Sequence, residues 1–231
     1  MNYEPDTRDT SADPSVREMV GQGRTIPSSF SLAEQLQAAH EARKPASDQQ
    51  PEFLCGDAVA AFVQAVEVRE RYCKRSVVLQ EDALQAMVED KVGVGNMTTA
   101  AAVAQVLVEL GVHAEDRKGG KLSTLYKAKR VLRIKTSAHE MLLEVRKTLM
   151  HGHAIFLGHW ASAAFMQVPD GKPVEPGSRS TPMASTIVGY DQLGNFEVAP
   201  PGLSVRKVTG EWLMSEAIEM LVVDGAPEAA K

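Results

Sequence analysis

The chain has 231 residues, of which 44% are hydrophobic and 24% are charged. These proportions exclude a wholly disordered or fibrous protein, and the length is sufficient for one domain with a sizeable core. The formal net charge of −5 gives no electrostatic reason to expect nucleic acid or an anionic membrane as a partner.

Neither a membrane span nor a targeting signal is expected. No apolar run approaches the roughly 20 residues that cross a bilayer, and residues 1–6 lack the basic and apolar regions of a secretory signal. With only two cysteines, Cys55 and Cys73, the sequence contains no disulfide framework. We therefore expect synthesis in the cytoplasm.

Residues 1–52 are polar and rich in Pro, Ser, Asp and Gln, and such a segment buries little apolar surface by itself. A short helix is predicted over 31–43, with Ser31 as the N-cap and Glu34 as its capping-box partner. We interpret residues 1–52 as an extended arm that becomes ordered on the body of the protein or on another subunit.

A domain is predicted over residues 53–225, followed by a short tail at 226–231. The part up to about residue 152 shows the 3.6-residue periodicity of helices at 57–72, 81–90, 100–110 and 138–150. The helix at 57–72 has an apolar face of small residues, and Gln64 and Glu67 are expected outside that face. Thr98 or Thr99 is placed to cap the third helix, and Gly111 to end it.

From residue 153 the periodicity changes to that of strands, which are predicted at 154–158, 184–191, 196–199 and 219–223. A tight turn is predicted at 192–195, and residues 168–182 form a long loop with four prolines. Helices followed by strands indicate an α+β fold rather than a βαβ repeat.

Several segments resemble papain-like cysteine peptidases. Val188-Gly-Tyr-Asp191, a turn and Phe196-Glu-Val198 are similar to the part of that family which carries the catalytic histidine and, one strand later, the asparagine. The helix through Ala65-Val-Glu67 resembles the central helix that begins at the catalytic cysteine, and Gly210 to Met214 resembles the closing strand. The resemblance covers about residues 53–224. It implies a fold of two subdomains, a helical half followed by an antiparallel strand-rich half, with a cleft between them.

The same resemblance implies that the catalytic residues have been lost. Papain-type catalysis needs a thiolate at a helix N-terminus and an imidazole base. The cysteine position falls on Asp57, or on Ala58 if the register shifts by one residue. The histidine falls on Met183, and the asparagine falls near Pro200 or Pro201.

The oxyanion-hole glutamine would lie near Gln49 or Gln50 and could survive. Because the reacting positions are missing, the resemblance predicts a catalytically inactive homologue without cofactors. An aspartate at a helix N-terminus is stabilising, so Asp57 would suit a chain that no longer needs a thiol.

Cys55 supports a different hypothesis, an active thiol enzyme. It lies near a helix start, where unpaired N–H groups stabilise a thiolate, and Cys55-Gly-Asp-Ala58 loosely resembles the nucleophile region of transglutaminase-like hydrolases. Such an enzyme needs a histidine, for which His153 and His159 are candidates, and an aspartate. A lone cysteine is more often a small buried hydrophobe, and Cys73 is expected to be structural.

Two other groups of residues are candidate sites. His151, His153 and His159 lack the further carboxylate or thiolate at a defined spacing that zinc sites usually have, so no metal site is predicted. A basic cluster runs from Arg117 to Lys135 in an otherwise acidic chain. We expect it to be a solvated face or a contact with an acidic subunit.

A scaffold without chemistry offers its surface. We therefore expect a structural or interaction subunit of a larger assembly, whose protein partners bind the 1–52 arm and the 168–182 loop. A bacteriophage virion, in its tail or baseplate, is the setting chosen by analogy. The alternatives are a peptide-binding module that uses the inactive cleft near Asp57, Trp160 and Met183, and the Cys55 enzyme.

Overall fold

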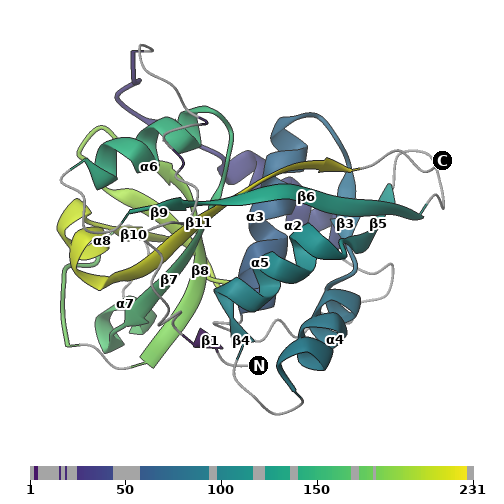
Figure 1. The fold of residues 1–231 in the computed structure, drawn as a ribbon. Helices are drawn as coiled ribbons and strands as arrows, with labels where there is room; N and C mark the ends of the chain where they lie inside the picture. Colours follow the sequence, from purple (N-terminus) through teal and green to yellow (C-terminus); the bar gives the residue numbers. More distant parts are fainter. Residues whose placement is uncertain are drawn as a thin grey trace.

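The structure is a computed structural model that describes residues 3–4, 16, 19, 25–43, 58–93, 98–116, 123–135, 140–167, 172–178 and 181–227. Helices cover part of a nine-stranded sheet whose neighbouring strands pair in antiparallel fashion (Figure 1). This mixture of helices and antiparallel strands confirms the α+β prediction.

The four helices predicted from periodicity and the one predicted from its cap are all present, with ends within three residues of the expected ones. The described helices are α2 (Ala33–Arg43), α3 (Ala58–Tyr72), α4 (Glu81–Val92), α5 (Ala100–Glu109), α6 (Met141–Met150), α7 (Ala163–Gln167) and α8 (Gly210–Glu216). Thr99 is the N-cap of α5, and its side chain accepts a hydrogen bond from the backbone N–H of Ala102 at 3.1 Å. Gly111 follows α5 with φ of +75°, a conformation that favours glycine.

The strands are β1 (Tyr3–Glu4), β2 (Phe30–Ser31), β3 (Val77–Leu79), β4 (Thr98–Thr99), β5 (Val112–Asp116), β6 (Ser123–Ile134), β7 (Ile155–Ala161), β8 (Thr181–Tyr190), β9 (Phe196–Ala199), β10 (Arg206–Val208) and β11 (Ala217–Pro227). The sheet runs in the order β10-β9-β8-β7-β11-β6-β5-β3, and β2 pairs with β8 outside this path. Strands β1 and β4 form a separate parallel pair.

Residues 210–214 correct the sequence interpretation, which gave them to a closing strand. They form α8 because Thr209 caps a helix there, accepting the Trp212 N–H at 3.1 Å. The closing strand is β11, which starts at Ala217.

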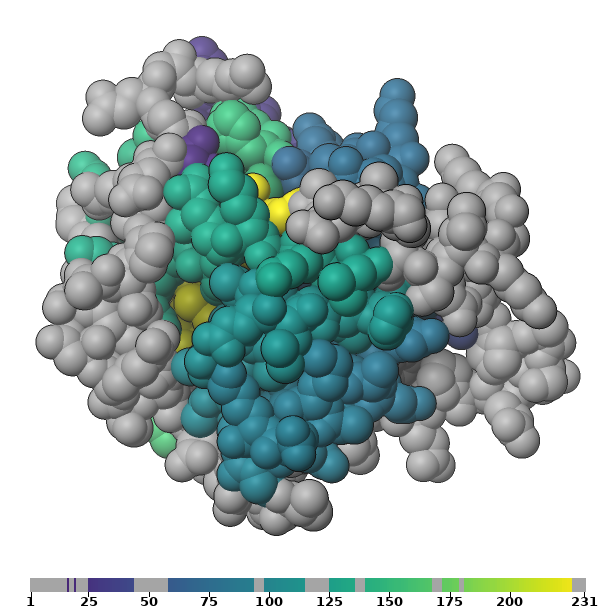
Figure 2. Space-filling view, turned by 45° about the vertical axis from the view of Figure 1, so that its right-hand side comes forward, coloured from purple at the N-terminus to yellow at the C-terminus, as the bar shows by residue number. Residues whose placement is uncertain are grey.

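The basic cluster also differs from the expectation. Much of it lies in β6, a strand inside the part that was read as helical, where it pairs with β11. Arg130 is 3.0 Å from Asp224, and Arg133 is 3.2 Å from the buried carboxylate of Glu219. These two arginines therefore bind acidic residues of their own chain. Figure 2 shows teal residues of the helical half beside small yellow areas that belong to the C-terminal part of the chain.

Helix α3 occupies the centre of the molecule. Its residues contribute to both hydrophobic clusters of the core: Ala65 and Val68 to one, Phe62 and Val66 to the other. The small side chains of α3 let the sheet come close, and the Thr186 hydroxyl of β8 donates to the Ala61 carbonyl at 3.1 Å. Burial extends all around the helix, so Gln64 and Glu67 are buried too, contrary to the expectation.

The described part of the N-terminal arm packs on the body of its own chain. Phe30 and Ser31 of β2 pair with Tyr190 and Gly189 of β8, and α2 packs against α3. Leu32 and Leu36 are buried in the core. Residues 25–43 of the arm are therefore ordered on the body of the protein, which is one of the two surfaces expected from the sequence.

Candidate functional site

The described positions that the resemblance gives to catalytic residues lie on elements that meet around α3. Ala58, the cysteine position in the shifted register, is the first residue of α3 and is fully buried. Strand β8 is hydrogen-bonded to α3 through Thr186. Strand β9 is hydrogen-bonded to α3 through Gln64, whose amide donates to the Ala199 carbonyl at 2.9 Å. Asp57, Cys55, Gln49 and Gln50 lie outside the described residues.

Met183 is near the start of β8, opposite His159 of β7. Its side chain is 8% exposed and belongs to the same core cluster as Phe165 and Trp212. The next residue, Ala184, belongs instead to the cluster that contains Ala58, as expected when successive side chains of a strand point to opposite faces. A thioether in such surroundings neither donates nor accepts a proton.

Pro200 directly follows β9 and is buried. Its ring offers no group that could orient an imidazole. The positions given to the base and its orienting residue, Met183 and Pro200, therefore hold no titratable side chain, and neither does Ala58.

His159 is the cross-strand partner of Met183. Its Nε2 lies 2.9 Å from Ser185 Oγ, and its ring packs against Phe165 and Trp212 with centroid distances of 4.8 and 5.2 Å. Burial in these apolar surroundings lowers the pKa of His159 to about 4. The ring is fully buried, so it is neutral at pH 7 and has no access to a substrate.

His153 is also buried, and desolvation lowers its pKa to about 4. Across the described ranges, no three His, Cys, Asp or Glu side chains are grouped closely enough to hold a metal ion. The distance from Cys55 to either histidine lies outside what the structure describes.

Sequence reasoning missed a segment at the junction of the two halves. Tyr3 and Glu4 of β1 pair in parallel with Thr98 and Thr99 of β4, which precede α5 in the helical half. Strand β1 also contacts β8 of the strand-rich half, and β4 contacts α3 (Figure 1). Tyr3 and Glu4 thus lie in extended form between the two halves. The polar composition of residues 1–52 gave no signal for this placement.

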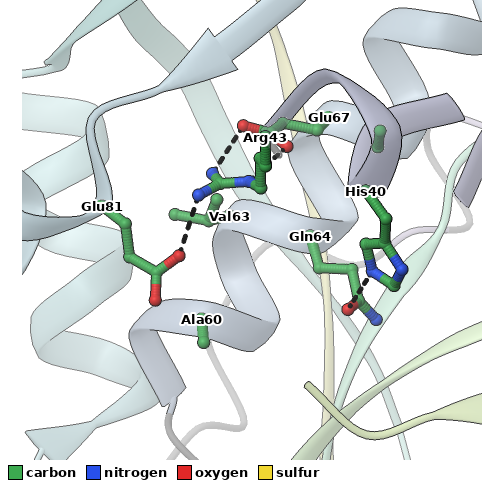
Figure 3. A pocket seen from close by; sticks show the side chains of 8 residues that line it. His40, Arg43, Ala60, Val63, Gln64, Glu67 and Glu81 are labelled. Carbon is green, nitrogen blue, oxygen red and sulfur yellow. Dashed lines mark hydrogen bonds and ion pairs between the residues drawn. The ribbon is translucent and has the colours of Figure 1, made fainter. Parts of the chain in front are cut away.

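A second feature that was missed is a buried ion cluster between α2, α3 and α4 (Figure 3). The Arg43 guanidinium donates to both carboxylate oxygens of Glu67, at 2.6 and 2.8 Å, and to Glu81 at 3.0 Å. Glu67 accepts the Leu79 N–H at 2.7 Å, and Arg43 donates to the Leu79 carbonyl at 3.2 Å. These two side chains therefore satisfy the backbone N–H and C=O groups of Leu79 in the edge strand β3.

Burial raises the pKa of Glu67, and the neighbouring Arg43 opposes that change. A small cavity of about 10 Å³ lies beside the cluster, large enough for about one water molecule. His40 and Gln64, 3.2 Å apart, line the same cavity. The cluster holds α2 against α3 and β3, and nothing in its geometry suggests chemistry.

Comparisons with known proteins identify the fold. No family model and no curated protein sequence matches the chain. Among solved structures, it is similar to xylellain, a cysteine protease from Xylella fastidiosa, with 15% identity, a TM-score of 0.65, and coverage of 97% of this chain and 96% of that one.

Two further structures are procathepsin B S9 from Trypanosoma congolense and the proform of Amb a 11, a cysteine protease of ragweed pollen. Their identities to the chain are 14% and 15%, and their TM-scores are 0.69 and 0.61. They cover 99% and 90% of this chain, which covers 87% and 68% of theirs. At such low identity the likeness shows the fold, and it confirms the papain-like α+β fold expected from the sequence.

Proposed function

We propose that this chain, which has a papain-like fold, is a catalytically inactive homologue that acts by binding other proteins. The proposal depends on Met183, the position that the resemblance gives to the family's general base, and it is supported by the packing of this side chain among apolar neighbours. A papain-type nucleophile depends on the imidazole for its thiolate. Without that base, a papain-like fold provides a scaffold but no papain-type catalysis.

Hydrolysis of a panel of fluorogenic peptides tests this proposal. We expect the wild type to show no thiol-dependent turnover, that is, no turnover that is sensitive to iodoacetamide. The variants Cys55→Ala and Cys73→Ala should give the same result. The rival hypothesis, an enzyme based on Cys55, predicts turnover that is lost in Cys55→Ala and kept in Cys73→Ala. That outcome would contradict the proposal that the protein is catalytically inactive.

Alkylation of Cys55 as a function of pH provides a second test. For an ordinary thiol we expect the alkylation rate to rise with a midpoint at about pH 8.5. An inaccessible thiol would not react. Cys73, which is partly exposed, serves as the internal control in the same sample. Fast alkylation of Cys55 well below pH 7 would reveal an activated thiolate.

A second candidate function is the binding of extended peptides at the junction of the two halves. It is favoured by β1, an extended segment that pairs with β4 and contacts β8. The likeness to procathepsin B extends over 99% of the chain and so takes in nearly all of the N-terminal segment. Strand addition is a common mode of peptide recognition, and β1 would compete with an external peptide.

The double substitution Tyr3→Pro/Glu4→Pro tests this competition in the full chain, because proline removes the backbone donors of β1. A labelled peptide with the sequence of residues 1–8 should bind more tightly to this variant than to the wild type. A scrambled peptide is the control. Equal binding of both peptides would contradict the idea.

We further propose that the protein partners are subunits of an assembly, with a bacteriophage virion as the setting. Support comes from the described part of the proline-rich loop, residues 172–178, which is exposed except for the buried Val174. In the described part of the chain, no helix has the length and apolar character needed to cross a bilayer. Mass spectrometry of purified virions would test the setting.

A further inference from the structure

Three large apolar side chains are exposed on elements that lie close together in the fold. Leu143 of α6 is 42% exposed, Leu193 of the β8–β9 turn 82%, and Met214 of α8 52%. Their elements meet at Gly210, where an added Cβ would lie 3.1 Å from Leu142 Cδ1 and 3.6 Å from the Gly194 carbonyl oxygen. We call Leu143, Leu193, Met214 and the neighbouring Arg146 the Leu193 surface.

The turn that carries Leu193 is held by the Asp191 carboxylate. Its Oδ1 accepts the N–H groups of Leu193 and Asn195 at 2.9 and 3.0 Å, and Gly194 adopts φ of +88°. Exposed turns usually carry polar residues, whereas this one presents a leucine whose backbone is held by the Asp191 carboxylate. A loop that is already ordered loses less conformational entropy on binding.

Arg146 gives the Leu193 surface a positive charge. Its guanidinium lies over the rings of Tyr190 and Phe196, 5.4 and 5.8 Å from their centroids. Its Nη2 is close to the turn, 3.3 Å from the place of a Cβ at Gly194. Within the described residues Arg146 makes no ion pair, while the nearby Lys207 is 3.5 Å from Asp191.

We propose that the Leu193 surface binds a segment of a partner protein in which an acidic residue is flanked by bulky apolar side chains. The carboxylate would pair with Arg146, whose stacked guanidinium is suited to bidentate contacts. The apolar residues would cover Leu193, Leu143 and Met214. A second copy of this chain fits less well, because a two-fold contact places the same surface, with the same cation, on both sides.

Selection of 12-residue peptides from a random display library on the immobilised full-length protein tests the proposal. The enriched peptides should carry Asp or Glu next to Leu, Ile, Met or Phe. Affinity for synthetic copies should fall at least about tenfold in Leu193→Ser and in Arg146→Gln, as at interface hot spots. Leu110→Ser, which changes a leucine that is 54% exposed at the end of α5, should leave affinity unchanged.

The opposite results are equally defined. No enrichment, or binding that is insensitive to Leu193→Ser, would overturn the proposal. A concentration-dependent dimer that Leu193→Ser abolishes would identify a second copy as the occupant. Binding to phosphatidylserine vesicles that Arg146→Gln abolishes, without peptide binding, would identify a membrane surface. Unchanged melting temperatures of the variants would exclude unfolding as the cause, and none of these results bears on the junction between the halves.

Discussion

His159 lies in the strand-rich half against the rings of Phe165 and Trp212, and its only polar side-chain contact described is with Ser185. Burial there favours the neutral imidazole, so the pKa falls to about 4, whereas an unfolded chain protonates histidine near about 6.5. The unfolded state therefore binds more protons at mildly acidic pH. The stability that depends on neutral His159 is present above about pH 6.5 and is lost as the pH falls towards about 4.

We expect this residue to lower the free energy of unfolding by roughly 3 kcal/mol between pH 7 and pH 4. Urea unfolding at several pH values measures how steeply the free energy of unfolding changes with pH. This slope should decrease in His159→Gln. The matched control is His113→Gln at an exposed position of β5. An equal decrease in both variants would show that burial of His159 is not the cause.

Arg43 is the second residue whose effect depends on burial. Its removal leaves the carboxylate of Glu67 buried without its cation, at a cost of about 3–5 kcal/mol. We therefore expect Arg43→Met to be strongly destabilising in urea unfolding. Arg43→Met/Glu67→Gln should recover part of the loss, because an amide oxygen can still accept the Leu79 N–H. Lys91→Met, which opens the exposed pair with Glu109, should have a much smaller effect.

At the scale of elements, Gly189 decides whether β2 can pair with β8. A Cβ at this position would lie 2.3 Å from Glu197 Oε2 and 2.8 Å from the Phe30 carbonyl oxygen. The backbone contact cannot be relieved by a side-chain rotation, so β2 must move away. We expect Gly189→Ala to cost about 1–3 kcal/mol.

Hydrogen exchange measures this effect directly, because the Leu32 N–H bonds to the Val188 carbonyl at 2.7 Å. Its exchange should accelerate in Gly189→Ala. Gly177→Ala is the control, since the atoms nearest to its Cβ would be 3.8 Å away. Unchanged exchange of Leu32 in Gly189→Ala would mean that the N-terminal segment is not held as described.

The same scale shows why β6 escaped the sequence interpretation. Its lysines and arginines suggested a solvated face, yet Tyr126, Ala128, Leu132 and Ile134 are buried and recur with the two-residue period of a strand. Thus the pattern was present in the sequence. What the sequence did not show was the pairing of β6 with β11, whose acidic side chains accept hydrogen bonds from the arginines of β6.

At the scale of the whole molecule, one sheet joins both halves. Strand β11 pairs with β6 of the helical half and with β7 of the strand-rich half. The two halves consequently share one core strand, and we expect them to unfold together.

Two probes separate the halves in one experiment. Trp160 and Trp212 both lie in the strand-rich half, whereas the longest helix, α3, lies in the helical half. Urea transitions followed by tryptophan fluorescence and by circular dichroism at 222 nm should coincide. Two separate midpoints would show that the halves are independent despite β11.

The sequence by itself determined the local structure of this protein. Periodicity located α3 to α6 and most strands of the strand-rich half, and a capping pattern located α2. Thr98 or Thr99 and Gly111 marked the limits of α5, and the order of segments indicated the papain-like fold. These features depend on residues close together in the chain, and so they can be read from it. The assignment of catalytic positions to Asp57, Met183 and Pro200 likewise came from sequence and remains a prediction.

Only the tertiary structure decided which polar residues are buried and what they bind. Glu67 was expected away from the apolar face of its helix, but α2 covers it and supplies Arg43 from 24 positions away. Tyr3 and Glu4 lie beside β4, nearly one hundred residues later in the chain. Such contacts are fixed by the packing of distant elements, because the cost of an unpaired buried charge or backbone group depends on whatever the fold brings next to it.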